Sequence, residues 1–86
     1  MIEGVIHRTR RPSLEYKVVL EYDPAEECWV TFVPSLDDIS TWGKSKEEAL
    51  ENTREAITGY LEALRKEGLP LPPKRSVEIA DVVVAV

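Results

Sequence analysis

Reactive and cross-linking side chains are scarce in this chain of 86 residues. It contains a single cysteine, Cys28, and a single histidine, His7. A lone cysteine excludes an intrachain disulfide, and so small a supply of both residues excludes the multi-cysteine and multi-histidine sites that hold zinc. We therefore expect no metal and no cofactor, and we interpret Cys28 as a small buried hydrophobe.

Long apolar runs are absent as well. No segment approaches the about 20 apolar residues that a membrane-spanning helix needs, and no apolar region follows the basic N-terminus as it would in a signal peptide. The sequence therefore predicts a cytoplasmic protein without membrane contact. The basic cluster comprises His7, Arg8, Arg10 and Arg11. Residues 1–12 fit a solvated arm, an extra edge strand, or a patch that touches nucleic acid or an acidic partner.

The remaining composition is that of one globular domain spanning residues 1–86. Apolar residues make up 43% of the chain, and its net charge is −5. An acidic chain is repelled by phosphate, which disfavours broad binding to nucleic acid and suits a basic protein partner. Because so short a chain buries only a modest core, we expect a homodimer or homotetramer.

Hydrophobic periodicity predicts strands over residues 14–22, 28–33 and 39–42. The first of these segments alternates apolar and polar residues from Leu14 to Tyr22, which is typical of a half-buried strand. Pro34 ends the second strand because proline has no N–H to donate. A final strand is predicted over residues 76–85, which are rich in valine.

A helix is predicted over residues 45–67. Ser45 followed by Glu48 forms a capping box, and Gly68 suits the position after the last turn. Gly59 lies inside the helix, where a close approach to another element would explain it. The apolar face that follows helical spacing comprises Ala49, Leu50, Thr53, Ala56, Ile57, Tyr60, Leu61 and Leu64.

This order of elements predicts an α+β fold of the two-layer β-β-β-α-β type, with one helix packed on a mixed sheet. A right-handed crossover would place the last strand parallel to the first. One helix covers one sheet face, so we expect self-association to cover the other.

No catalytic motif is present, and we predict that the protein is not an enzyme. Residues 43–45 resemble the end of a phosphate-binding loop, but Asp38 occupies the place of the upstream glycine. Four aspartates could converge as in two-metal nucleases, although turn roles explain most of them. These are Asp23, Asp37, Asp38 and Asp81. A degenerate nuclease is therefore kept only as a third hypothesis.

The two tryptophans are the side chains most suited to a binding interface, although both also fit a small core. Trp29, Thr31 and Val33 share one face of the second strand, and that face needs cover because it is largely apolar. The predicted partner or oligomer interface consists of Trp29, Thr31, Val33, Trp42, Val82 and Val84.

Four segments together carry a family resemblance. They are residues 16–21, 29–36 with the V-P-x-L turn, 41–50 with the helix entry, and 68–72. The chain resembles the HicB-like antitoxin family, in a short stand-alone form. The resemblance implies a partial ribonuclease-H-like fold without that enzyme's active site. It also implies a protein that assembles as dimers or larger oligomers and masks a small, basic, RNA-cleaving toxin.

Two features depart from the family pattern. Asp38 and Ile39 stand where members often have glycine and cysteine, and many members continue into a C-terminal DNA-binding domain, whereas this sequence ends at Val86. We therefore expect no direct DNA binding. The alternative function is that of a stand-alone oligomeric domain with a regulatory or ligand-binding role and no toxin partner.

Overall fold

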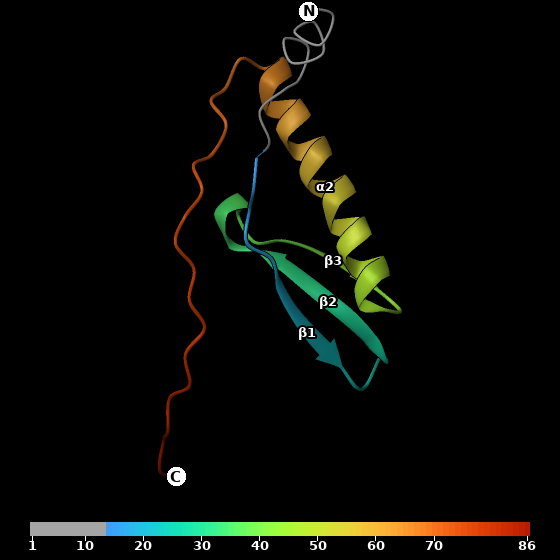
Figure 1. Cartoon of the computed structure of the whole chain (residues 1–86), viewed down its shortest axis with the longest axis vertical. Helices are drawn as coiled ribbons and strands as arrows, with labels where there is room; N and C mark the ends of the chain where they lie inside the picture. The colour runs from blue at the N-terminus through green and yellow to red at the C-terminus, as the bar shows by residue number, and fades with distance from the viewer. Residues whose placement is uncertain (1–13) are drawn as a thin grey trace, which may run out of the picture.

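The computed structural model describes residues 14–86, which form an antiparallel sheet followed by one long helix (Figure 1). The strands are β1 (Val19–Asp23), β2 (Cys28–Val33) and β3 (Ile39–Gly43). A 3-10 turn, η1 (Pro34–Leu36), joins β2 to β3, and helix α2 (Lys46–Lys66) follows. The predicted α+β class is confirmed. The predicted arm over residues 1–12 lies outside the described residues.

The sheet is a meander in the order β1-β2-β3, with both pairs antiparallel. β1 starts at Val19, later than the predicted residue 14, because its partner runs out. Val19 pairs with Phe32, and Pro34 ends β2 directly after Val33. Residues 14–18 therefore run beside α2 without a strand to pair with.

The β1–β2 hairpin is closed by a local side-chain bond. Asp23 Oδ1 accepts from the backbone N–H groups of Ala25 and Glu26, at 3.0 and 3.3 Å. Asp23 thus has the turn role that the sequence predicted for it. Glu27 completes the turn with φ of 53°, a left-handed conformation that side chains other than those of glycine, Asn and Asp rarely adopt.

Helix α2 begins as the capping pattern predicts. Ser45 Oγ accepts from the N–H of Glu48 at 3.1 Å, and the carboxylate of Glu48 accepts from the N–H of Lys44. Gly68 has φ of +72°, and its N–H donates to the carbonyl of Arg65. These bonds satisfy backbone groups at both helix ends that have no partner inside the helix.

The helix packs on one face of the sheet, and the contact is closest at Gly43. A Cβ at Gly43 would lie only 2.5 Å from the backbone nitrogen of Ala49, so only glycine lets α2 approach β3 there. Gly59 differs, because nothing lies within 4 Å of a Cβ placed on it. The close approach expected at Gly59 is therefore absent among residues 14–86.

The core is small and centres on the β2–η1 junction. Val33, Leu36 and Ala49 are fully buried, and Cys28 is buried as predicted. Thr31 and Thr53 are also buried, and their hydroxyl oxygens lie 2.6 Å apart. The V-P-x-L turn thus has a structural function, because it places Leu36 in the interior under α2.

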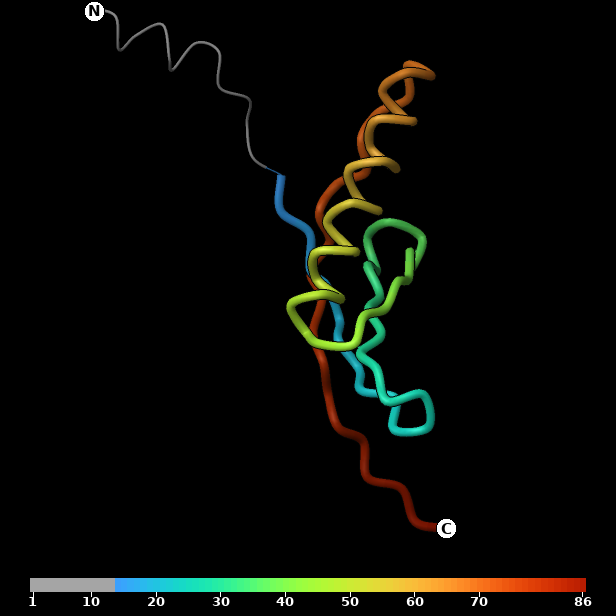
Figure 2. The backbone as a smooth tube through the Cα atoms, turned by 90° about the vertical axis from the view of Figure 1, so that its right-hand side faces the viewer, coloured from blue at the N-terminus to red at the C-terminus, as the bar shows by residue number. Residues whose placement is uncertain are grey.

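The strand predicted over residues 76–85 does not form in the single chain, and this part of the prediction is corrected. After α2 the chain turns back and extends past the β1–β2 hairpin (Figures 1 and 2). Within residues 14–86, its last polar contact with the domain is the N–H of Arg75, which donates to Ser35 Oγ at 3.1 Å. Beyond this point the segment has no neighbouring strand within residues 14–86, and a strand exists only in a ladder.

Candidate interaction surface

Within residues 14–86, one face of the sheet has no helix over it. Residues directly opposite each other on neighbouring strands point to the same side. Thr31 meets Thr53 of α2, so Thr31 and its cross-strand partners Leu20 and Thr41 face the helix. Strand alternation places the neighbouring residues on the opposite, uncovered face. That open sheet face carries Val19, Cys28, Val30, Phe32, Ser40 and Trp42.

Trp42 dominates the open sheet face. It is 57% exposed, although so large an apolar side chain is usually mostly buried. Beside it lies a hollow of about 470 Å³ that is lined by Val30 and Cys28, by the acidic residues Asp23 and Glu26, and by Lys44. The surface therefore combines an aromatic ring with two carboxylates and one ammonium group, and its net negative charge suits a basic side chain from a partner.

The position of Trp42 is fixed from two sides. Its backbone pairs with Val30 in the β2–β3 ladder. From the helix, Asn52 Nδ2 donates to the carbonyl oxygen of Trp42 at 2.8 Å. A side chain held on a strand whose backbone is bonded in this way loses little further freedom on binding, which favours affinity.

The structure separates the two tryptophans. Trp29 pairs with Gly43 on the helix side of the sheet. There its ring contacts the Tyr22 ring edge-on, at a centroid distance of 5.3 Å, and Lys46 Nζ lies 4.9 Å from its centroid. Trp29 and Trp42 therefore lie on opposite faces of the sheet, and Trp29 is held by contacts within the chain.

The other predicted interface residues divide in the same way. Thr31 and Val33 have no exposed surface, because α2 of the same chain covers them. The sequence indicated that the face of β2 with Trp29, Thr31 and Val33 would be covered, and α2 covers it. Val82 and Val84 lie in the extended C-terminal segment and are strongly exposed. Trp42, Val82 and Val84 therefore remain available to a partner.

The aspartates do not gather at one place. Asp23 bonds its own turn, and Asp37 accepts from Tyr60 Oη at 3.4 Å. Within residues 14–86, no three His, Cys, Asp or Glu side chains are grouped in a way that could hold a metal ion. Asp38 has positive φ next to Asp37, as turn residues of this type do.

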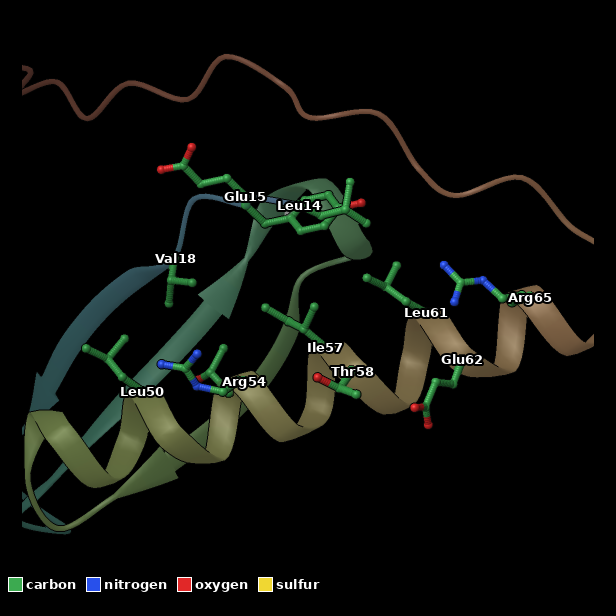
Figure 3. A pocket seen from close by; sticks show the side chains of 12 residues that line it. Leu14, Glu15, Val18, Leu50, Arg54, Ile57, Thr58, Leu61, Glu62 and Arg65 are labelled. Carbon is green, nitrogen blue, oxygen red and sulfur yellow. The ribbon is translucent and has the colours of Figure 1, made fainter. Parts of the chain in front are cut away.

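A second hollow lies on the opposite side of the sheet, between residues 14–18 and α2. It has a volume of about 690 Å³. Figure 3 shows Leu14 and Val18 on one wall and Leu50, Ile57 and Leu61 on the other. We call this hollow the α2 groove. The sequence assigned the helix residues to the buried face but gave no sign that the sheet ends short of them.

Together, the fold and its surfaces define a class of protein. It is a small α+β domain that displays an aromatic, acidic surface and an apolar groove, with its aspartates engaged in turns or spread apart. No helix within residues 14–86 is long and apolar enough to cross a membrane. These features are typical of a protein-binding domain.

The comparisons with known proteins give the family. Residues 16–83 match the HicB_like antitoxin of bacterial toxin-antitoxin system family, and the chain belongs to this family. A UPF0150 protein of Thermoplasma acidophilum is 38% identical over 66 residues, which are 77% of this chain and 94% of that protein. A UPF0150 protein of Helicobacter pylori is 40% identical over 67 residues, which are 78% and 90% of the two chains. No solved structure matches the chain significantly.

Proposed function

We propose that this protein is an antitoxin that neutralises a small, basic, RNA-cleaving toxin by covering the toxin's active surface. Family membership supports a toxin–antitoxin role. The observation that carries the proposal is Trp42, exposed beside the carboxylates of Asp23 and Glu26. Ring and carboxylates are arranged to receive an arginine or lysine of the kind that an RNA-cleaving protein uses to hold phosphate.

The mechanism requires binding alone. The net charge of −5 would speed the encounter with a basic partner through long-range attraction. Trp42 would then bury its ring against the toxin, with Asp23 and Glu26 paired to a cation beside it. Enzyme inhibition would follow because the basic groups that bind RNA are occupied.

The test uses this protein and a small basic ribonuclease encoded beside its gene. We expect Trp42→Ala to weaken binding by at least tenfold, because a central aromatic anchor contributes about 2 kcal/mol or more. Tyr22→Ala is the matched control, since Tyr22 is an exposed aromatic residue on the helix side of the sheet. It should change the affinity by less than about threefold.

Isothermal titration calorimetry measures both affinities, and an RNA-cleavage assay measures neutralisation. Equal losses for the two variants would contradict a role for the open sheet face. Failure of the wild-type chain to bind or inhibit the neighbouring ribonuclease would contradict the antitoxin function itself.

A second candidate is a stand-alone domain with a regulatory or ligand-binding role and no toxin. The α2 groove favours it, because a hollow of about 690 Å³ with apolar walls has the size of a small-molecule site. A gene neighbourhood without a small basic protein, together with saturable binding of an apolar ligand that Leu61→Glu abolishes, would support this candidate over the first.

A further inference from the structure

The C-terminal segment of the chain combines strong β propensity with nearly complete exposure. Residues 77–84 contain four valines and an isoleucine. Ile79 is 80% exposed, Val82 81% and Val83 96%. Glu78 and Asp81 interrupt the segment, but residues 82–84 are three consecutive exposed valines, which a monomer rarely displays, so this segment has the properties of a strand that lacks a partner.

The domain offers a complementary site. β1 pairs with β2 on one side only, so its other edge presents backbone N–H and C=O groups to solvent within residues 14–86. The α2 groove lies between α2 and residues 14–18, which lead directly into β1, and it is open enough to leave Leu14 and Leu50 exposed. A strand added at the β1 edge would pair its backbone there and direct alternate side chains into the groove.

We propose that residues 77–84 of one copy of this chain occupy the β1 edge and α2 groove of a second copy, and that the exchange is reciprocal. Each copy supplies one strand and one groove, so a two-fold dimer satisfies both and leaves neither open. The family match extends to residue 83, so all but the last residue of this segment lies within the matched part of the chain. The exchange uses no residue of the open sheet face and is independent of toxin binding.

Contacts of residues 72–75, the connector between α2 and the C-terminal segment, explain why a second copy occupies the groove. Tyr16 Oη donates to the carbonyl of Pro72 at 2.9 Å, Arg75 is tied to Ser35, and Lys74 Nζ lies 3.7 Å from Glu15 Oε1. These contacts hold the connector against residues 15–16. In Figure 3 that segment lies between the chain's own C-terminal segment and the helix wall of the groove. Residues 77–84 are thereby separated from the groove of their own chain by residues 15–16.

The first experiment separates donor from acceptor in full-length chains. Val82→Asp with Val84→Asp makes a donor-defective chain, and Leu50→Glu makes a groove-defective chain. All three side chains are exposed in the single chain, so each variant should fold, as circular dichroism would verify. Leu69→Glu, an equally exposed site outside both elements, is the control.

Sedimentation equilibrium gives the outcome. We expect wild type and Leu69→Glu to dimerise, and each defective chain alone to dimerise at least tenfold more weakly. The mixture should form a heterodimer, because one intact segment meets one intact groove. A monomeric wild type, or defective chains that dimerise as wild type does, would overturn the exchange. So would defective chains that fail to associate when mixed.

A second experiment distinguishes exchange from folding back within one chain. With Cys28→Ser as background, Leu50→Cys and Val82→Cys are introduced together and oxidised, because Val82 is one of the alternate side chains that the exchange directs into the groove. A disulfide-linked dimer on a non-reducing gel supports exchange. A cross-link confined to the monomer would overturn it, as would the absence of any cross-link between the two positions.

Discussion

At the scale of single residues, the buried hydroxyl pair is the most informative detail of the interior. Thr53 Oγ1 lies 2.7 Å from the carbonyl oxygen of Ala49 and 2.6 Å from Thr31 Oγ1, where either hydroxyl can donate, and Thr31 Oγ1 also lies 3.3 Å from the carbonyl oxygen of Thr41. Thr31 Oγ1 in turn accepts from the N–H of Thr41 at 3.3 Å. One chain of hydrogen bonds therefore joins α2, β2 and β3 where the core has few apolar side chains.

Replacing one threonine of this pair should lower the free energy of unfolding by more than half of the loss caused by replacing both. We expect Thr53→Val to lower the free energy of unfolding by about 1–2 kcal/mol, because the Thr31 hydroxyl loses its closest buried hydrogen-bond partner. The double variant with Thr31→Val should lose clearly less than the sum of the two single losses. Urea denaturation measures all three, with Thr58→Val on the exposed helix surface as control. Additive losses would show that the hydroxyls do not depend on each other.

A second residue-scale prediction concerns Tyr60. Partial desolvation, followed by the negative charge and hydrogen bond of Asp37, raises the pKa of Tyr60 above its ordinary value of 10.0. Because the folded state holds this proton more tightly, the resulting stabilisation is complete below pH 10.0 and is lost as the pH rises through the raised pKa. Asp37→Asn should move the pKa of Tyr60 back toward its ordinary value.

Ultraviolet absorbance of the phenolate follows this titration, in a background with Tyr16 and Tyr22 replaced by Phe. Asp38→Asn is the control, since Asp38 is the adjacent carboxylate with the same backbone conformation. If Asp37→Asn and Asp38→Asn lower the pKa of Tyr60 equally, the specific contact with Asp37 is refuted.

At the scale of elements, the sequence predicted what local chemistry determines. Ser45 and Glu48 gave the start of α2, Gly68 its end, and Pro34 the end of β2, because each acts on its own backbone. The sequence could not decide which face of β2 the helix would cover, since Val30 and Phe32 on one side are as apolar as Trp29 and Val33 on the other. Only the packed structure shows which face of β2 the helix covers, and therefore that Trp42 is exposed.

The two glycines next to or within α2 give a matched pair of predictions. Gly43→Ala should destabilise the fold by about 2 kcal/mol or more, because its Cβ would overlap the helix backbone at Ala49. Gly59→Ala should stabilise it by up to about 1 kcal/mol, since the helix gains a better helix former and nothing obstructs the methyl group. Thermal unfolding followed by circular dichroism measures both. A loss of stability in Gly59→Ala would reveal a contact at that position in an assembly.

At the scale of the whole molecule, the chain is too extended for a compact unit. Its radius of gyration is 17.1 Å, whereas a compact domain of this length has about 12 Å. Residues 69–86 extend past the sheet (Figure 1); valine content predicted a strand there but could not supply its partner. Strand pairing between distant segments or copies is not a local property. The partner of this strand could therefore not be predicted from the sequence.

The arrangement of the two tryptophans also provides two intrinsic fluorescence probes, one on each face of the sheet. Trp42 lies in water on the open sheet face, and Trp29 lies on the other side between Tyr22 and the ammonium of Lys46. A protein that covers the open face would shift the emission of Trp42 to shorter wavelengths and shield it from an aqueous quencher such as iodide. A strand added beside β1 would instead disturb Trp29 through Tyr22. The colour and quenching of intrinsic fluorescence would thus tell which side of the sheet has been engaged, without any label.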